Sequence, residues 1–405
     1  MNKIPKKEID PKLIPEVNIG TLGHVDHGKS TLVQAISGKW PAVHSEELKR
    51  GITIKLGYAD ATIYKCNKCN IFCSKEKCPN CSEKCEPQRT VSFVDAPGHE
   101  TLMATVLAGA SLMDGILFVI AANEKCPQPQ TREHMMVLNI VGIKNVVIVQ
   151  AKIDLVTKEE ALEHYKQIKE FVKGTVAENA PIIPISAQNK INIEAVLGAI
   201  QNYMPTPQRD TSKPPKMLVA RSFDVNKPGT EIEKLMGGVI GGALIEGELK
   251  INDEIEIRPG VFLKNKWTPL KTKVVGLQKA RKNLEKAGSG GLLGVLTGLD
   301  PSLTKADYLA GSVAGNNLPP VLDKITLKVN LFEKSLEEKV EPIKVGEQIM
   351  LNVGTARTIG TIKDVKKDVT EIELKLPVCV DKSDRVVLSR KIAERWRLIA
   401  HGRIQ

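Results

Sequence analysis

A glycine-rich stretch near the start of the chain has the residue types that bind phosphate. Residues 23–30 fit the pattern G-x-x-x-x-G-K-[ST] and lie between an expected strand and an expected helix. In such a loop the backbone N–H groups wrap around the phosphates, Lys29 reaches the β- and γ-phosphates, and Ser30 can ligate Mg²⁺. We therefore expect a nucleotide phosphate site made by Asp26, His27, Gly28, Lys29, Ser30 and Thr31.

A second short motif, Asp95-Ala96-Pro97-Gly98, follows the apolar run 91–94. The pattern D-x-x-G is by itself a common turn, but one strand after a phosphate loop it predicts a second phosphate-sensing loop. Asp95 would hold Mg²⁺ through water, and the Gly98 N–H would meet the γ-phosphate. Between the two loops lies the stretch 50–54, whose Thr53 completes the expected Mg²⁺ ligands, Ser30, Thr53 and Asp95.

Two further segments follow apolar runs and are expected to bind the base. Residues 151–154 follow the run 146–149, and residues 186–188 follow the run 182–185. Ligands of doubly wound sheets bind at the carboxyl ends of the strands. A carboxylate at Asp154 accepts hydrogen bonds from N1–H and the amino group of guanine, and adenine offers no such pair, so GTP is favoured over ATP. The expected base-binding residues are Ala151, Lys152, Asp154, Ser186, Ala187 and Gln188.

Six of the eight cysteines fall within twenty residues, with the spacing C-x₂-C-x₃-C-x₄-C-x₂-C-x₃-C. Two C-x₂-C pairs in a reducing compartment are typical of a tetrahedral zinc site, and they predict the ligands Cys66, Cys69, Cys78 and Cys81. Cys73 or Cys85 could replace one of these, because other sets of four thiolates exist. A disulfide knot and an iron–sulfur cluster are the alternatives to zinc.

The surrounding chain predicts the elements that position these residues. As far as residue 207, strand-like runs alternate with helical stretches, which indicates βαβ units and a parallel sheet. A proline-rich linker follows, and then short β-rich runs separated by turn residues predict two β-barrels, divided near residues 315–320. We thus expect an α/β P-loop domain at 1–207 with a zinc knuckle at about 64–89, followed by β-barrels at 216–320 and 321–405.

Composition limits the kind of protein. The chain has 405 residues, 42% of them hydrophobic, and a formal net charge of +11. No apolar run approaches the length of a transmembrane helix, and the basic N-terminus lacks the apolar stretch of a secretory signal, so a cytoplasmic protein without a membrane partner is expected. The charge suits a polyanionic partner, although a solvated lysine surface would account for it equally well.

The five nucleotide motifs, in this order, resemble those of the translational GTPases, and His99 directly after Gly98 strengthens the likeness. The resemblance implies that His99 is catalytic and orients the water that attacks GTP. In one place the chain departs from the family. The family's guanine motif is N-K-x-D, and position 151 here is alanine, so the amide that normally touches the base is missing while Asp154 keeps the preference for guanine.

The cysteine-rich insertion resembles the zinc knuckle of the gamma subunits of archaeal and eukaryotic initiation factor 2. This likeness spans nearly the whole chain and includes the blocks 44–51, 127–134, 221–229, 300–307 and 395–397. It implies that Asp26 and Gly51 help hold a second Mg²⁺. It also implies a GTP-dependent carrier of initiator methionyl-tRNA that releases the tRNA on hydrolysis and acts with alpha and beta subunits on the small ribosomal subunit.

Two other functions agree with the same residues. The first is an elongation-type carrier of any aminoacyl-tRNA, which selectivity for initiator tRNA would distinguish. The second is a scaffold that assembles a complex without hydrolysing GTP, which Ala151 makes conceivable.

Overall fold

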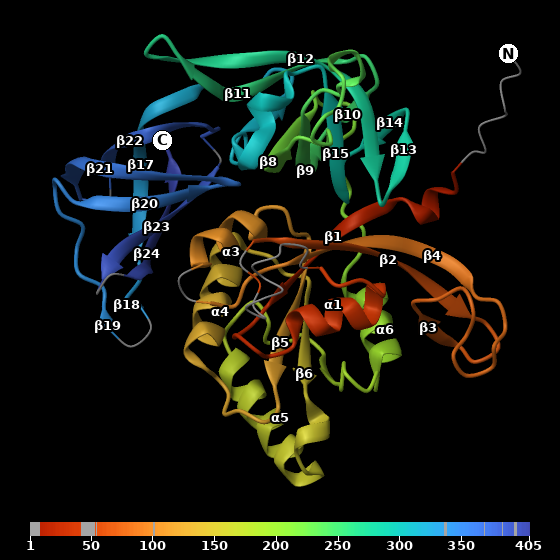
Figure 1. Cartoon of the computed structure of the whole chain (residues 1–405). Coiled ribbons are helices and arrows are strands. Elements are labelled where there is room, and N and C mark those ends of the chain that lie inside the picture. The colour runs from red at the N-terminus through yellow and green to blue at the C-terminus, as the bar shows by residue number, and fades with distance from the viewer. Residues whose placement is uncertain are drawn as a thin grey trace, which may run out of the picture.

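The computed structural model describes residues 9–41, 53, 55–99, 102–335, 338–367, 369–382, 384–392 and 395–405. The chain forms a sheet covered by helices and two closed barrels stacked beside it (Figure 1). No helix within the described ranges is long and apolar enough to cross a membrane.

The first unit is a seven-stranded sheet in the order β3-β2-β4-β1-β5-β6-β7. Its strands are β1 (Pro15–Leu22), β2 (Gly57–Cys66), β3 (Ile71–Cys73), β4 (Glu86–Asp95), β5 (Gly115–Ala121), β6 (Val146–Ala151) and β7 (Ile182–Pro184). The helices described in this unit are α1 (Lys29–Ser37), α3 (Met103–Ala110), α4 (Pro129–Val141), α5 (Lys158–Val172) and α6 (Ile193–Tyr203).

Both faces of this sheet are buried, as the continuous apolar runs predict. On β5, Phe118 packs into the core shared with α3, α4 and α5, while Val119 points to the core shared with α1 and α6. Every residue of β5 is buried. The sheet is therefore fixed between two layers of helices, and the carboxyl ends of its parallel strands form one rigid edge.

The sheet is mixed, which differs from the parallel sheet expected from the sequence. Strands β1, β4, β5, β6 and β7 are parallel, but β2 runs antiparallel to β4, and β3 runs antiparallel to β2. The reason is the connection, because parallel neighbours need a long crossover, usually a helix, whereas antiparallel ones do not. The β2–β4 connection is the cysteine-rich insertion, which carries only β3, so β2 returns directly alongside β4.

The second unit is a closed ring of six strands. It consists of β8 (Lys216–Phe223), β9 (Val239–Glu246), β15 (Leu292–Thr297), β12 (Lys266–Lys279), β11 (Glu254–Leu263) and β16 (Val313–Gly315), with β13 (Lys282–Leu284) added to β12. The short strands β10 (Glu248–Lys250) and β14 (Lys286–Gly288) pair separately. The expected β-barrel is confirmed, and its interior is filled by aliphatic side chains.

The third unit is a closed barrel in the order β17-β22-β21-β20-β23-β24. These strands are β17 (Val321–Leu331), β22 (Val369–Cys379), β21 (Ala356–Lys366), β20 (Gln348–Val353), β23 (Arg385–Ile392) and β24 (Arg395–Ile404). A small hairpin of β18 (Lys334–Ser335) and β19 (Glu338–Lys339) lies outside the ring. The two predicted barrels are thus both present.

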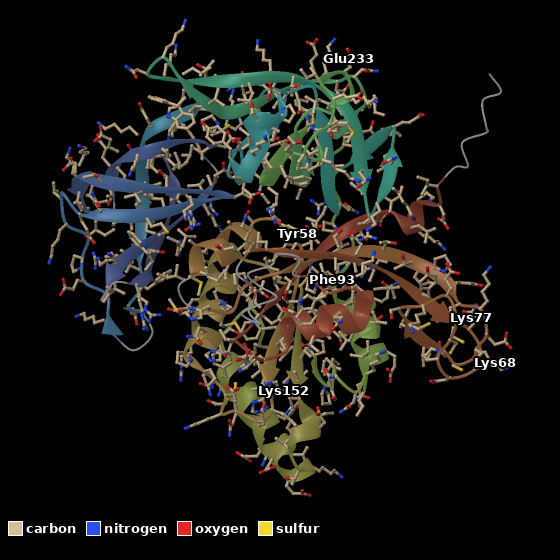
Figure 2. The ribbon with its side chains drawn as sticks, in the orientation of Figure 1. Tyr58, Lys68, Lys77, Phe93, Lys152 and Glu233 are labelled. Carbon is tan, nitrogen blue, oxygen red and sulfur yellow. The ribbon has the colours of Figure 1, made fainter. Side chains whose placement is uncertain are left out.

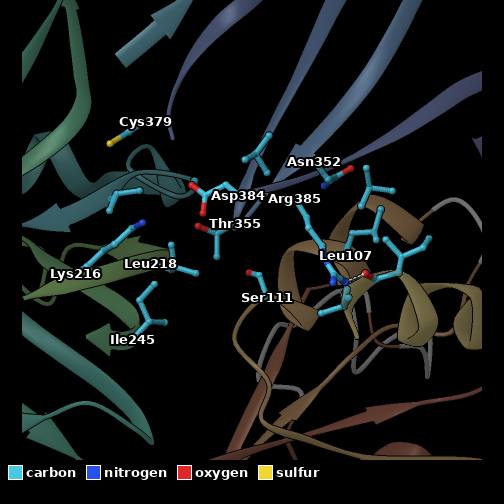
Figure 3. Close-up of a pocket in the computed structure, with 17 residues that line it drawn as sticks. Leu107, Ser111, Lys216, Leu218, Ile245, Asn352, Thr355, Cys379, Asp384 and Arg385 are labelled. Atoms are coloured by element: carbon cyan, nitrogen blue, oxygen red, sulfur yellow. Dashed lines mark hydrogen bonds between the residues drawn. The ribbon is translucent and has the colours of Figure 1, made fainter. Parts of the chain in front are cut away.

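The three units meet around a cavity of about 250 Å³ (Figure 3). From the third unit, the Asn352 side-chain amide donates to the backbone carbonyl of Ala104 at 3.0 Å. Arg385 donates to the carbonyl of Ile140 near the end of α4. In the linker, Arg209 forms an ion pair with Asp114 at 2.6 Å, and both side chains are largely buried. The barrels are thus attached to the helical unit by directed polar contacts as well as by apolar packing.

Candidate nucleotide and metal sites

The phosphate loop joins the carboxyl end of β1 to the start of α1, as expected. Two glycines are required by the backbone. Gly28 has φ +92° and is the N-cap of α1, where no side chain caps the helix. A Cβ on Gly23 would lie 2.1 Å from the carbonyl oxygen of Val119, so only glycine lets the loop pass this close to β5. The loop therefore presents an uncapped helix N-terminus, a favourable place for an anion.

Lys29 lies folded back over this loop. Its ammonium group donates to the carbonyls of Gly23 at 3.0 Å and His24 at 2.6 Å. Burial lowers the pKa of Lys29 to about 8, while Asp95 and Asp26 oppose this shift. Gly98 lies against the same group, because a Cβ there would be 2.5 Å from the Lys29 Nζ. The two predicted phosphate loops thus face each other across one lysine.

Asp95 is the centre of a cluster of hydroxyl groups. Its carboxylate accepts hydrogen bonds from Ser30 at 2.6 Å and Thr21 at 2.6 Å, and the Thr53 hydroxyl lies 3.5 Å away. Ser30 and Thr53 are 3.1 Å apart. Burial raises the pKa of Asp95, and these hydrogen bonds and Lys29 counteract the effect. A cluster of one carboxylate and hydroxyl oxygens beside a phosphate loop has the ligand chemistry that Mg²⁺ prefers.

Two buried histidine side chains, His27 and His134, connect the phosphate loop to β5 and α4. The buried ring of His27 contacts the Val119 carbonyl at 3.2 Å and the Glu124 carboxylate at 3.3 Å. Its side chain thus anchors the loop to β5, and only its backbone is left to meet a phosphate. His134, fully buried on α4, accepts a hydrogen bond from the Gly23 N–H at 2.8 Å. Burial lowers the pKa of His134 to about 3, so its ring is neutral and can accept.

The roles of Thr21, Glu124 and His134 in this site were not predicted from the sequence. Thr21 had a signal, since it is a polar residue near the end of the expected strand, two residues before the loop. His134 lies more than a hundred residues from Gly23, and no spacing rule connects them.

The expected base-binding segments also meet at the strand ends. Ala151 is the buried last residue of β6, and Lys152 after it has φ +59°. Asp154 lies exposed in the short 3₁₀ turn 153–155, and the Ile153 N–H donates to the Ile185 carbonyl at 3.2 Å. This bond ties the segment to 186–188. Ser186 there is buried, whereas Gln188 is exposed. Thr31, Ala187 and Gln188 line one cavity of about 380 Å³.

The remaining site predictions concern His99, Asp26 and Gly51. His99 is exposed directly after Gly98. Asp26 has φ +58° within the phosphate loop. Gly51, named for a second Mg²⁺, lies outside the described residues, as does the block 44–51.

The cysteine cluster separates into a group of four thiols and a pair. The Sγ atoms of Cys66, Cys69, Cys78 and Cys81 all lie within 4.8 Å of one another. Cys73 and Cys85 lie together, with their sulfurs 3.2 Å apart. A gathered set of four thiols matches the donors of a structural zinc site, and it is the set expected from the two C-x₂-C pairs. Figure 2 places this knuckle at the far end of β2 and β4, with Lys68 and Lys77 on its outside.

Family models of translation factors match both ends of the chain. Residues 15–206 match the family model described as elongation factor Tu GTP binding domain. Residues 323–404 match that of initiation factor eIF2 gamma, C terminal. The chain is 57% identical over 400 residues to translation initiation factor 2 subunit gamma of Methanocaldococcus jannaschii, covering 96% of this chain and 97% of the relative. The protein of the same name from Archaeoglobus fulgidus is 56% identical over 402 residues, covering 97% of this chain and 95% of that relative.

Solved structures share the fold at lower identity. A bacterial selenocysteine-specific elongation factor EF-Sec has a TM-score of 0.75 and 23% identity over 96% of this chain, which spans 58% of the length of that protein. Elongation factor SelB from Methanococcus maripaludis, solved with the GTP analogue GppNHp, has a TM-score of 0.72 and 23% identity over 97% of this chain and 79% of its own. At this identity the likeness concerns the fold alone.

The grouping of the thiols predicts how the knuckle binds metal. We expect about one zinc per chain, and Cys66→Ser to lose it, because four thiolates complete a tetrahedral site. Cys73→Ser is the matched control and should retain the zinc. Elemental analysis of the purified variants measures this. Iron in place of zinc, or equal zinc loss in both variants, would contradict the assignment.

The alanine at position 151 predicts that this chain binds guanine nucleotides more weakly than a variant with asparagine at that position. Ala151→Asn supplies an amide for the base, and a net hydrogen bond contributes about 0.5–1.5 kcal/mol. Since about 1.4 kcal/mol is a tenfold change, we expect GTP and GDP to bind several-fold more tightly. Asp154→Ala should abolish the preference for GDP over ADP. Calorimetric titration tests both variants. Unchanged or weaker binding by Ala151→Asn would mean that a neighbouring group already fills this place.

Proposed function

Because the chain belongs to the family of translation initiation factor 2 gamma subunits and is a translational GTPase, we propose that it carries initiator methionyl-tRNA to the small ribosomal subunit in its GTP-bound state. Hydrolysis of GTP then releases the tRNA. The observation that carries this proposal is the meeting of Ser30, Thr53 and Asp95 beside Lys29, because it joins both nucleotide loops to the segment that contains Thr53.

The phosphates occupy the loop at the start of α1. The N–H groups of residues 26–31 face them, and Lys29 turns from the Gly23 and His24 carbonyls to the β- and γ-phosphates. The Gly98 N–H binds the γ-phosphate, which its close approach to Lys29 supports. Burial of this lysine strengthens its attraction to phosphate, because little water screens it.

Ser30, Thr53 and Asp95 hold Mg²⁺, and Asp26 and Gly51 help hold a second ion. Bound Mg²⁺ neutralises the charge that develops on the phosphate oxygens. The chain's own part is to fix the ligands. Asp95 keeps Ser30 and Thr53 within hydrogen-bond range, and Thr21 fixes the other carboxylate oxygen.

The guanine base binds between the segments 151–154 and 186–188. Asp154 accepts from N1–H and the amino group, and Lys152 covers the ring. Ala187 and Gln188 close the other side, which their position beside Thr31 in one cavity supports. Ser186 stays buried and its hydroxyl accepts from the Asn189 N–H at 3.3 Å, so it shapes the loop.

His99 orients the water that attacks the γ-phosphate. Its exposed position directly after Gly98 supports this role, because a water-orienting group must stand next to the glycine that senses the γ-phosphate. The zinc knuckle is structural. Alpha and beta subunits bind the second unit and the GTPase unit respectively, and together the three subunits form a heterotrimer.

Binding of initiator tRNA in two nucleotide states tests this function. We expect the full chain with a non-hydrolysable GTP analogue to bind initiator methionyl-tRNA more tightly than the same chain with GDP. The analogue carries a γ-phosphoryl group that GDP lacks, and Thr53 lies where this group would be sensed. Elongator methionyl-tRNA is the matched control in a filter-binding assay. Equal affinity for both tRNAs would favour an elongation-type carrier.

The position of His99 predicts the effect of its removal. His99→Ala should leave the affinity for GTP nearly unchanged and slow stimulated hydrolysis by about two or more orders of magnitude, because the water loses its orienting group. Single-turnover hydrolysis in the initiation complex measures the rate. An unchanged rate would remove His99 from the catalytic machinery.

A further inference from the structure

The segment that follows Thr53 is attached to the second unit by a salt bridge. Thr53 belongs to the hydroxyl cluster around Asp95, and Lys55 lies two residues further along the chain. The Lys55 ammonium donates to the Asp307 carboxylate at 2.8 Å. Lys55 belongs to the GTPase unit and Asp307 to the six-stranded barrel that begins at β8, so the contact crosses between units.

Asp307 is held in place from within its own barrel. Its second carboxylate oxygen accepts from the Arg221 Nε at 2.8 Å and the Ser222 N–H at 3.2 Å, both on β8. Ala306 and Asp307 are the last two residues of the 3₁₀ stretch Pro301–Asp307, and both have positive φ, +53° and +61°. Burial opposes ionisation of Asp307, yet hydrogen bonds from Lys55 and Arg221 keep the pKa of Asp307 below its ordinary value. The barrel therefore presents a fixed carboxylate toward the GTPase unit.

The residues that follow Lys55 are buried between α3 and the barrel. Leu56 is buried against α3, so closely that a Cβ on Gly109 would lie 2.6 Å from its side chain. Tyr58, at the start of β2, lies between the sheet and the barrel (Figure 2), and burial raises the pKa of its hydroxyl. The chain that follows Lys55 is therefore in contact with α3 and lies beside the barrel.

Two other contacts between the same two units involve residues outside the nucleotide loops. Lys282 of the barrel donates to the Leu13 carbonyl at 2.8 Å, and the Leu292 N–H donates to the Ser92 hydroxyl at 3.2 Å. Leu13 precedes β1, and Ser92 lies within β4, so neither belongs to a nucleotide loop. Of these three contacts, the Lys55–Asp307 pair alone joins the barrel to the segment that contains Thr53.

We propose that Asp307, through Lys55, is a positioning residue that couples the Mg²⁺-binding Thr53 segment to the placement of the barrel. This inference rests on the proposed function, in which Thr53 is placed by Mg²⁺ and the γ-phosphate. With GTP bound, the ordered segment presents Lys55 to Asp307. With GDP bound, the segment loses that order and the salt bridge opens.

Thermodynamic linkage gives this coupling a direct measure. If GTP favours the salt bridge, then the salt bridge must favour GTP by the same factor. Lys55 is about half exposed, and pairs of this kind contribute little, so the factor is small. Loss of the pair should weaken binding of a GTP analogue about two- to fivefold and leave GDP binding unchanged.

The test measures the ratio of the two affinities in the full chain with Mg²⁺, using fluorescent GDP and a fluorescent imido analogue of GTP. Lys55→Met removes the pair and leaves the Asp307–Arg221 contact intact. Asp307→Asn removes the charge with a residue that tolerates positive φ. Each variant should lower the preference for the GTP analogue. The double variant should lower that preference no further than Asp307→Asn alone, because Lys55→Met and Asp307→Asn both remove the Lys55–Asp307 salt bridge.

Lys282→Met is the matched control, since it removes a lysine contact between the same two units away from the nucleotide loops. It should leave the ratio unchanged. Equal weakening of both nucleotides in Lys55→Met, an unchanged ratio, or additive effects in the double variant would overturn the coupling. None of these measurements depends on tRNA, so a failure of initiator tRNA binding with a changed ratio would refute the proposed carrier function and leave the coupling standing.

Discussion

The carboxylate of Asp95 is fully buried, and the organisation of the site follows from what that burial requires. An ionised carboxylate without partners is very costly in a protein interior, so its oxygens must be surrounded by donors. The donors come from Thr21 on β1, Ser30 on α1 and the Thr53 segment. Satisfying one buried charge therefore brings together three separate parts of the chain, and it places Thr53 beside the phosphate loop.

The sequence predicted those features that depend on local pattern. The apolar runs identified the buried strands. The motifs placed Lys29 and Ser30 at the start of the helix after β1, and Asp95 at the end of β4, where the structure has them. It did not predict contacts between distant segments, such as His134 with Gly23, because nothing in the spacing links α4 to the phosphate loop. The antiparallel pairing of β2 with β4 was not predicted, because the apolar pattern of a strand does not show in which direction the strand runs. The proposed domain boundaries and ligand roles stay predictions.

The cysteine cluster shows how folding resolves an ambiguous spacing. Six thiols allow several sets of four, and the sequence alone left Cys73 and Cys85 as competitors. The pairing of β2 with β3 sets Tyr64 opposite Cys73, which places Cys73 beside Cys85. The two turns that hold the C-x₂-C pairs then face each other. The register of one short strand thus separates the thiols into a group of four and a pair.

Closure of the third unit has a consequence for how it can be recognised. Each of its six strands has a hydrogen-bonded neighbour on both sides, and β17 pairs with both β22 and β24. No row of backbone groups is left open within this ring, so another chain cannot extend it by adding a strand. A partner must instead contact side chains and loops on the outer surface of the barrel. Recognition of this unit therefore depends on the chemistry of its outward-facing side chains and not on its backbone hydrogen bonds.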